Sequence, residues 1–452
     1  MKHKPTFHLT IHFVLLVSIL LAFQVWAQDA SKAFKWGFRE RIRNTYMNNI
    51  IDFNDGVDDK TDMIRVRTNL WGQYSFSPKL SVFVQFTNEF RPFLIDPKDR
   101  DFTLNEIIVD NLYLNWTTGG DNPVSLRIGR QNLIYGEGFI MLEGGPWDGS
   151  RAIYHDAVKL SVKRGTTTID FLGISNTRIE ERLPVIKSSK LKNGELKGQP
   201  KDQPMNDGKE QALGVYAVHK SPTGARWDAY YFFKTEDPDP IIPVSPWKDK
   251  LKLNTIGGRL QKPVSSRLKL TTEWAYQFGS QGNINQRSFG GYGYLSYLVQ
   301  EKSKGTLTGG LVYLSGDNPD TPDNEGWNPL FSRWPKWSEL YIYSQIGETI
   351  QGARKVAYWT NTVSPYVVYA FNLSPKINFS ATFYHLNALY GRYLGEELSG
   401  TTRGDEIQFL VKFKINQFLT AHFLYDQFFP GDFYKEPRSA GSFIRGEVMY
   451  RF

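Results

Sequence analysis

The stretch that decides the fold closes the chain: Gly441-Ser-Phe-Ile-Arg-Gly-Glu-Val-Met-Tyr-Arg-Phe452. Two kinds of residue alternate in it with a period of two, which predicts a β-strand. One face carries Ile444, Gly446, Val448, Tyr450 and Phe452, and the other carries Phe443, Arg445, Glu447, Met449 and Arg451. A transmembrane barrel wall has two such faces, because one meets lipid and the other meets a watery lumen. An amphipathic edge strand of a soluble sandwich would show the same alternation.

The amino-terminal sequence favours the barrel. Lys2 and Lys4 precede an apolar run from Ile11 to Phe23, and Val25-Trp-Ala27 then offers a small-x-small cleavage site. This pattern predicts a secretory signal peptide at residues 1–27, cleaved near Ala27, and a mature chain of residues 28–452. No later segment approaches eighteen apolar residues in a row, and the mean hydropathy is −0.41, which argues against a helical membrane protein. Bacterial outer-membrane proteins commonly end in a strand with a terminal Phe, and the strand ending at Phe452 resembles theirs.

The composition agrees with an exported barrel. The chain has no cysteine, so its stability cannot depend on disulfides and must come from a large hydrogen-bonded framework. A closed barrel supplies this framework because every strand is paired. Aromatic residues make up 15% of the chain, as expected where aromatic girdles mark two membrane interfaces. The net charge of +8 is modest and does not indicate a nucleic-acid partner.

Alternating segments recur along the whole mature chain. We predict about eighteen strands, an even number, as bacterial single-chain barrels require. They lie near Phe34–Thr45, Met63–Phe76, Leu80–Arg91, Glu106–Trp116, Val124–Gln131, Asp156–Lys163, Thr167–Ser175, Ala212–His219, Trp227–Lys234, Lys252–Leu260, Leu268–Phe278, Phe289–Val299, Thr306–Leu314, Thr362–Phe371, Ile377–His385, Glu406–Phe413, Leu419–Gln427 and Ser442–Phe452. The sequence therefore predicts one all-β domain, a transmembrane antiparallel barrel.

Short and long connections alternate between these strands. Short ones such as Ser77-Pro-Lys79 and Ser374-Pro-Lys376 are rich in turn-forming residues, and long ones include 176–211 and 315–359. In outer-membrane barrels the short turns face the periplasm and the long loops face the exterior. This arrangement places both termini on the periplasmic side.

Basic residues gather on the predicted inner face of the first strands. By parity, Arg39, Arg41 and Arg43 of the first strand and Arg65 and Arg67 of the second point into the lumen. The same parity adds Arg127, Lys159, Lys163, Lys269, Arg445 and Arg451. A basic strip in a low-dielectric channel concentrates anions and holds carboxylates or phosphates through forked hydrogen bonds. We therefore predict that the strip binds substrate and sets ion selectivity.

Inward carboxylates oppose this strip. Glu89 shares the inward parity of the third strand, and Glu447 lies between Arg445 and Arg451. They would either neutralise the strip as ion-pair ladders that stiffen the wall or form a second rail that keeps anion binding weak enough for conduction. The sequence leaves both alternatives open.

Several motifs resemble the alginate-export family of outer-membrane barrels. They are Leu126-Arg-Ile-Gly-Arg-Gln131 leading into Gly136-Glu-Gly138, Gly144-Gly-Pro-Trp-Asp-Gly149 with Arg151, Tyr313-Leu-Ser-Gly-Asp317, and Gly326-Trp-Asn-Pro-Leu330. The resemblance covers nearly all of the mature chain. It implies a monomeric eighteen-stranded barrel with an electropositive lumen for an acidic polysaccharide, in agreement with the strand count and the basic strip.

The loop from Asn132 to Arg151 is rich in glycine, which lets its backbone approach other chain closely. We expect it either to enter the lumen as a constriction or to lie on the surface. Its candidate constriction residues are Gly136, Glu137, Gly144, Asp148 and Arg151.

Catalytic and metal-binding motifs are weak in this sequence. It has neither a Gly-x-Ser-x-Gly elbow nor a metal-spaced histidine pair, and its acidic loop runs lack the spacing of an EF-hand. We therefore expect neither an enzyme nor a cofactor or metal site.

Three functions fit these observations. The first is a channel that exports an anionic polysaccharide or oligosaccharide of the alginate type. The second is a selective porin that imports small anions or sugar acids, and the third is a structural or adhesive barrel. The expected surroundings are outer-membrane lipid, lipopolysaccharide and the barrel-assembly machinery, and we expect a monomer.

Overall fold

The computed structural model of the chain describes residues 33–50, 53–97, 106–142, 154–187, 208–238, 248–332, 337–340, 359–393, 396–397 and 400–452. The predicted signal peptide, residues 1–27, lies outside these residues. Within them the chain forms twenty-two strands, of which eighteen are long. No helix long and apolar enough to cross a membrane occurs in these ranges.

The long strands follow the chain around the sheet. They are β1 (Phe34–Asn48), β2 (Thr61–Ser77), β3 (Leu80–Phe90), β5 (Glu106–Thr117), β6 (Val124–Gln131), β7 (His155–Arg164), β8 (Thr167–Asn176), β10 (Glu210–Lys220), β11 (Arg226–Glu236), β12 (Leu251–Pro263), β13 (Leu268–Gln281), β14 (Ile284–Gln300), β15 (Gly305–Leu314), β16 (Thr362–Ser374), β17 (Ile377–Asn387), β20 (Thr402–Lys414), β21 (Leu419–Pro430) and β22 (Gly441–Arg451). The short strands are β4 (Phe93–Ile95), β9 (Val185–Lys187), β18 (Arg392–Tyr393) and β19 (Glu396–Glu397).

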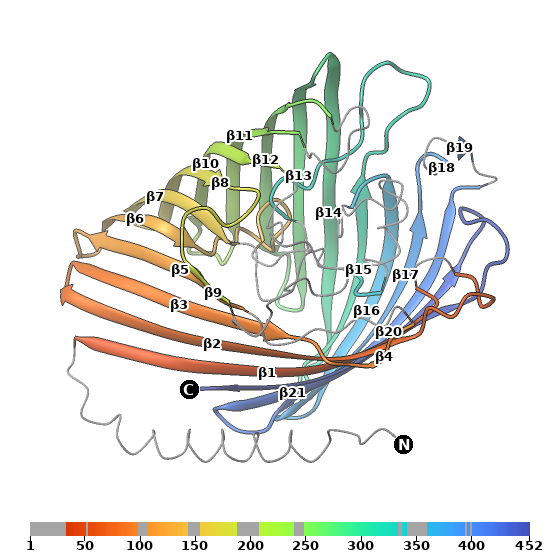
Figure 1. Cartoon of the computed structure of the whole chain (residues 1–452), viewed down its shortest axis with the longest axis horizontal. Helices are drawn as coiled ribbons and strands as arrows, with labels where there is room; N and C mark the ends of the chain where they lie inside the picture. Colours follow the sequence, from red (N-terminus) through yellow and green to blue (C-terminus); the bar gives the residue numbers. More distant parts are fainter. Residues whose placement is uncertain are drawn as a thin grey trace.

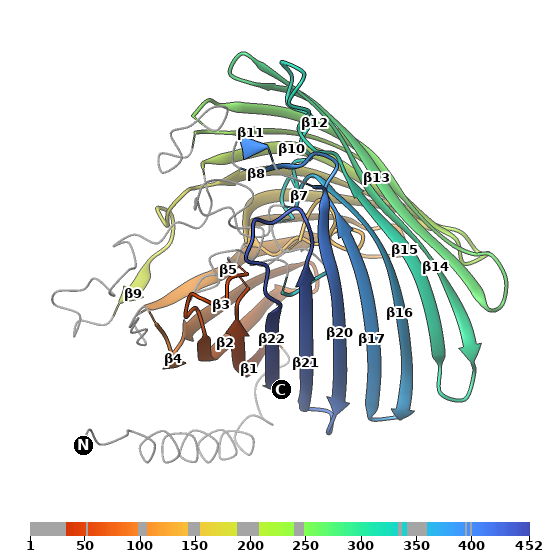
Figure 2. The ribbon, with the colours of Figure 1, turned by 90° about the vertical axis from the view of Figure 1, so that its right-hand side faces the viewer.

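The sheet closes on itself. Each long strand pairs antiparallel with the next, and β22 pairs with β1 (Figures 1 and 2). At this seam the backbone amides and carbonyls of Phe38 and Phe452 exchange hydrogen bonds of 3.2 and 3.1 Å. Closure leaves no long edge strand, which suits a sheet surrounded by lipid. The prediction of an eighteen-stranded antiparallel barrel is confirmed.

The outer face of the barrel is apolar. Val448 in β22 is 45% exposed, Ile128 in β6 is 47% exposed and Leu213 in β10 is 67% exposed. Their sequence neighbours of opposite parity point inward, and these include the buried Arg445 and Glu447. The ring of Phe452 lies 4.9 Å from that of Trp36, edge to face, on the outer side of the seam. The terminal strand therefore has the two faces that its alternation predicts.

All eighteen predicted strands match long strands, with differences at their ends. The largest is in β14, which begins at Ile284 instead of Phe289. The four short strands were not predicted. β9 lies within the predicted connection 176–211 and pairs with the start of β5, so part of that connection extends the wall.

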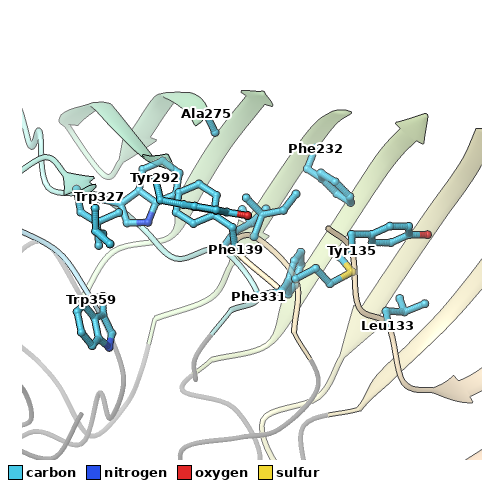
Figure 3. Close-up of a cluster of buried hydrophobic side chains, with 14 of the residues drawn as sticks. Leu133, Tyr135, Phe139, Phe232, Ala275, Tyr292, Trp327, Phe331 and Trp359 are labelled. Carbon is cyan, nitrogen blue, oxygen red and sulfur yellow. The ribbon is translucent and has the colours of Figure 1, made fainter. Parts of the chain in front are cut away.

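The apolar core lies inside the barrel. It joins inward side chains of the wall, such as Phe232, Ala275 and Tyr292, to Tyr135, Phe139, Trp327 and Phe331 from two connections (Figure 3). These connections, which we call the inner segments, are residues 132–142 after β6 and residues 315–332 after β15. A parallel bridge between Met141 and Phe331 joins them. The interior is therefore partly filled by the chain itself.

Candidate functional site

A group of arginines lines the inner face where β22, β1, β2 and β3 adjoin. We call Arg39, Arg41, Arg43, Arg65, Arg67, Arg91 and Arg445 the arginine cluster. The register of β1 and β2 places Arg41 opposite Arg67 and Arg43 opposite Arg65. Like charges directly opposite one another destabilise a sheet, so this register requires nearby counter-charges.

Glu89 of β3 supplies one of these counter-charges. Its carboxylate lies 2.9 Å from Nη2 of Arg41, 2.8 Å from Nη2 of Arg65 and 2.8 Å from Nε of Arg67. Arg91 is more distant, with its Nε at 3.5 Å. The Glu89 side chain is fully buried, with 0% exposure. Charge-assisted bonds of this kind are strong in a low-dielectric interior and fix the directions of the guanidinium groups.

Glu447 of β22 supplies a second counter-charge across the seam. Its Oε2 lies 2.7 Å from Nε of Arg43 and 3.9 Å from Nε of Arg41. Arg445, two residues earlier, donates from Nε to Nε2 of His422 at 3.0 Å and lies 2.8 Å from Glu339. The closure of the barrel therefore joins Arg445 to the arginines of β1.

Carboxylates hold most of the cluster in place. Among the described residues, six of the seven guanidinium groups contact the carboxylates of Glu89, Glu339 or Glu447. One layer along the wall, Nε of Arg39 donates to Asn69 at 2.8 Å, and Asn69 donates to Thr87 at 2.5 Å. These bonds hold the inner side chains of β1, β2 and β3 in fixed positions. The cluster is thus an ordered set of guanidinium groups.

Arg127 and Lys159 lie beyond β5 and form a separate basic pair. They are opposite each other on β6 and β7. The guanidinium of Arg127 lies 4.4 Å from the centre of the Tyr113 ring, and Nζ of Lys159 lies 3.2 Å from Asp170. Lys269 does not extend the cluster, because it is exposed beside the turn between β12 and β13. Inward parity gives the face of a residue, but not its place around the barrel.

The first inner segment contacts the wall through Glu137. Its Oε1 accepts hydrogen bonds from Nη2 of Arg259 at 3.1 Å and from the hydroxyl of Tyr294 at 2.6 Å. Gly136 has a φ of 59°, and a Cβ there would lie 3.0 Å from Oε2 of Glu273. Both features favour glycine at this position. Of the candidate constriction residues, Gly136 and Glu137 lie inside the barrel, whereas Gly144, Asp148 and Arg151 lie outside the described residues.

Aromatic stacking holds the same segment in place. The ring of Tyr135 stacks on that of Tyr216 with centres 4.2 Å apart, and its hydroxyl donates to Asp170 at 2.6 Å. Phe139 stacks on Trp327 of the second inner segment at 5.1 Å. Figure 3 shows Phe139 and Trp327 grouped with Tyr292 of the wall. Both inner segments are thus packed against the wall.

The second inner segment is held by a buried lysine. Nζ of Lys234 in β11 donates to the carbonyl oxygen of Leu330 at 2.9 Å and lies 2.7 Å from Glu210 and 2.9 Å from Glu236. The Lys234 side chain is fully buried, with 0% exposure. We did not identify Lys234 or Arg259 from the sequence. Both residues share the inward parity of their strands. Apolar residues such as Leu253 share it too, so the pattern does not single out the charged ones.

No group of three or more His, Asp or Glu side chains in the described ranges could hold a metal ion. Two acidic residues after β15 have protein partners: Glu325 accepts hydrogen bonds from the backbone amide of Asn318 and the hydroxyl of Thr321 at 3.3 and 2.6 Å, and Asp323 accepts one from Asn285 of β14 at 2.9 Å. The arginine cluster and the inner segments are thus characterised by ion pairs, hydrogen bonds and aromatic contacts.

The chain matches no protein-family model and no curated protein. It is similar to solved structures from Pseudomonas aeruginosa. OpdK with vanillate has a TM-score of 0.57 at 11% identity, covering 92% of this chain and 98% of that chain. OccK2 (OpdF) in complex with glucuronate has a TM-score of 0.56 at 12% identity, covering 93% and 96%. OccK5 (OpdH) has a TM-score of 0.54 at 14% identity, covering 92% and 98%.

At these identities the likeness is one of fold. The closed barrel and its apolar exterior define the class of this protein, a β-barrel of the bacterial outer membrane. The resemblance to the alginate-export family is supported by these comparisons only as far as this class.

Proposed function

We propose that the protein is a substrate-selective porin that passes small organic anions, among them carboxylates and sugar acids. The observation that carries this proposal is the arginine cluster, in which buried Glu89 and Glu447 fix the guanidinium groups on the inner wall. An ordered set of guanidinium groups in a low-dielectric channel raises the local anion concentration, and these groups match the geometry of a carboxylate.

The two inner segments favour a small solute over a polymer. Tyr135, Phe139, Trp327 and Phe331 are buried inside the barrel and occupy space that a wide channel would leave open. The similar structures support the same choice, since vanillate and glucuronate are both carboxylates and were found with OpdK and OccK2, respectively. The importing porin, the second of the functions considered from the sequence, is therefore better supported than polymer export.

Export of an acidic polysaccharide remains the second candidate. The arginine cluster would bind uronate residues of a chain as well as single acids. The small-anion porin and the polysaccharide exporter differ in the length of the solute that passes through the barrel. We propose the same lumen residues for both: Arg39, Arg41, Arg43, Arg65, Arg67, Arg127, Lys159, Arg445, Glu89 and Glu447, with Gly136 and Glu137 at a constriction.

Planar-bilayer recording of the purified protein tests the proposal. We expect anion-selective conductance that monomeric uronate reduces, and loss or reversal of this selectivity in the double variant Arg65→Glu and Arg67→Glu. Exposed Arg267 and Arg287, near the ends of the hairpins, provide a matched charge-reversal control. A silent barrel, or a double variant that retains the ion preference, would contradict the proposal. Passage of long oligouronates alongside monomers would favour polysaccharide export.

Several expectations about the surroundings remain predictions. They are contact with lipopolysaccharide, assembly by the barrel-assembly machinery, the monomeric state and the boundary of the mature chain near Ala27. In the proposed function the arginine cluster binds anions electrostatically, and no residue is assigned a catalytic role.

A further inference from the structure

Three aromatic side chains form a continuous stack on the inner wall. We call Trp71, Phe83 and Tyr113, on the adjacent strands β2, β3 and β5, the aromatic row. The rings of Trp71 and Phe83 stack with centres 5.8 Å apart and planes at 21°, and those of Phe83 and Tyr113 stack at 5.0 Å and 14°. Arg127 of β6 continues the stack, with its guanidinium 4.4 Å from the centre of the Tyr113 ring.

The row faces the lumen. Trp71 has the same parity as the inward Arg67, whereas its neighbour Leu70 points outward and is 46% exposed. All three rings are half-buried. Gly37 of β1 makes room for the first ring, because a Cβ at this position would lie 2.5 Å from the Trp71 indole. The glycine opposite Trp71 thus allows the indole to lie against the wall.

The aromatic row and the arginine cluster lie on the same wall, and the row is nearer to the short turns. Trp71 follows Arg67 by four residues, which is about 13 Å along a strand. The hydrogen-bonded layer of Arg39, Asn69 and Thr87 lies between them. Phe83 is three residues from the start of β3, where the short turn ends. A solute that moves along this wall would therefore meet the arginine cluster and the row in succession.

Sheet stabilisation alone does not account for the row. Cross-strand aromatic pairs do stabilise sheets, and on the lipid face the rings of Tyr276 and Phe278, two residues apart on β13, also stack, at 6.0 Å and 23°. On the lumen side, however, water contacts the exposed part of each ring, and that contact has a free-energy cost. A solute ring that covers this surface removes the cost. Ring edges are also electropositive, so they tolerate an anion better than ring faces do.

We propose that the aromatic row and Arg127 form a second subsite, which selects anions that carry a ring. The ring of the solute packs against the aromatic row, and the carboxylate of the solute binds the Arg127 guanidinium on the side away from Tyr113. This subsite rests on the proposed porin function and specifies its substrate class as ring-bearing carboxylates. The arginine cluster attracts anions of every shape, whereas the row distinguishes among them.

Block of chloride current in planar bilayers tests the subsite, with benzoate compared with hexanoate, a chain acid of equal charge. We expect benzoate to block at a lower concentration than hexanoate. Phe83→Leu should reduce the ratio of the hexanoate to the benzoate blocking concentration about two- to thirteen-fold, because a ring contact contributes about 0.5–1.5 kcal/mol. Anion-over-cation selectivity should not change, since every arginine remains. The double variant Tyr276→Leu with Phe278→Leu removes two stacked rings from the lipid face and should leave the ratio unchanged.

Tyr113→Leu, at the end of the row next to Arg127, should also reduce the ratio. It provides a second test in case Phe83→Leu does not fold. Equal block by the two acids in an anion-selective protein would overturn the subsite and leave the proposed function standing. The subsite would also be overturned if the variants of the row kept the wild-type ratio of blocking concentrations. The same holds if the lipid-face control lowered that ratio as much as the row variants do. An unmodified protein without anion preference would overturn the proposed function and the subsite together.

Discussion

Arg65 donates from both Nε and Nη2 to Oε1 of Glu89, at 3.2 and 2.8 Å, and both side chains are buried. The bond joins neighbouring strands on the inner wall, and Arg41 and Arg67 lie against the other carboxylate oxygen. These ion pairs fit the first alternative for the inward carboxylates, a network that stiffens the wall, and the second, a rail that keeps anion binding weak, stays a prediction. Glu89 cross-links the wall, and it also fixes several guanidinium groups in the lumen.

Glu89→Gln should increase anion selectivity and decrease stability. A unit charge at 4 Å contributes about 1 kcal/mol in water, so the permeability ratio of chloride to potassium should rise about five-fold. Loss of a buried partner should lower the free energy of unfolding by about 3–5 kcal/mol. Reversal potentials and urea unfolding measure the two effects. Glu301→Gln, in an exposed turn, is the matched control. An unchanged reversal potential would show that Glu89 does not influence permeation.

Lys234→Met should release the second inner segment from the wall. The change removes the bond to the carbonyl oxygen of Leu330 and the cation that lies beside Glu210 and Glu236. Removing one member of a buried ion group costs about 3–5 kcal/mol, so the urea midpoint should fall and conductance should rise. Lys252→Met, on the exposed face of the adjacent strand β12, should change neither property. A variant that unfolds at the wild-type midpoint would contradict this role for Lys234.

The wall around the arginine cluster could be predicted because its two faces meet different solvents. In β2, Arg65 and Asn69 are buried inward, and Leu70 and Tyr74 are exposed outward, as their alternation predicts. Neighbouring strands in the chain are neighbours in an antiparallel barrel, and closure makes the last strand adjoin the first. Strand order and parity therefore place Arg43 and Glu447 on adjacent strands and the same face, and the register observed in the structure sets them opposite each other.

The filled part of the barrel could not be predicted in this way. Phe232, Leu253 and Ala275 point inward yet are apolar, because they pack against the inner segments. Where both faces of a strand are apolar, the alternation that identifies the lumen side is lost. Lys234 and Arg259 also contact the inner segments, at Leu330 and Glu137, which lie 96 and 122 residues away along the chain. Periodicity within a strand carries no information about such contacts.

Glu137→Gln should loosen the first inner segment without changing its size. The carboxylate accepts hydrogen bonds from Arg259 and Tyr294, and hydrogen bonds to charged groups contribute about 1.5–3 kcal/mol each. We expect larger current fluctuations and a higher mean conductance in single-channel recordings. Tyr294→Phe removes one of these bonds and retains the charge, so its effect should be smaller. Identical current records for the wild type and both variants would exclude this contact as a determinant of the open channel.

Glu180, in the connection between β8 and β9, belongs to a buried ion group. It contacts Arg130, which also lies 2.9 Å from Asp156, and it accepts a bond from the hydroxyl of Tyr154 at 2.9 Å. Burial raises the pKa of Glu180, but hydrogen bonds from Arg130 and from the backbone amides of Leu183 and Arg182 outweigh burial. The pKa is therefore held below its usual value.

This depressed pKa predicts a pH-dependent contribution to stability. A carboxyl group with a lowered folded-state pKa stabilises the fold fully above its unfolded pKa of about 4.3, and the contribution disappears as the pH falls through the folded value. Glu180→Gln should therefore lower the free energy of unfolding by about 1–2 kcal/mol at pH 7, and the difference from wild type should shrink as the pH falls below about 4. Urea unfolding of both proteins across this range measures the difference. Glu181→Gln, an exposed neighbour for which we expect little change at any pH, is the control. A wild-type advantage that grows on acidification would contradict the role assigned to the Arg130–Glu180 pair.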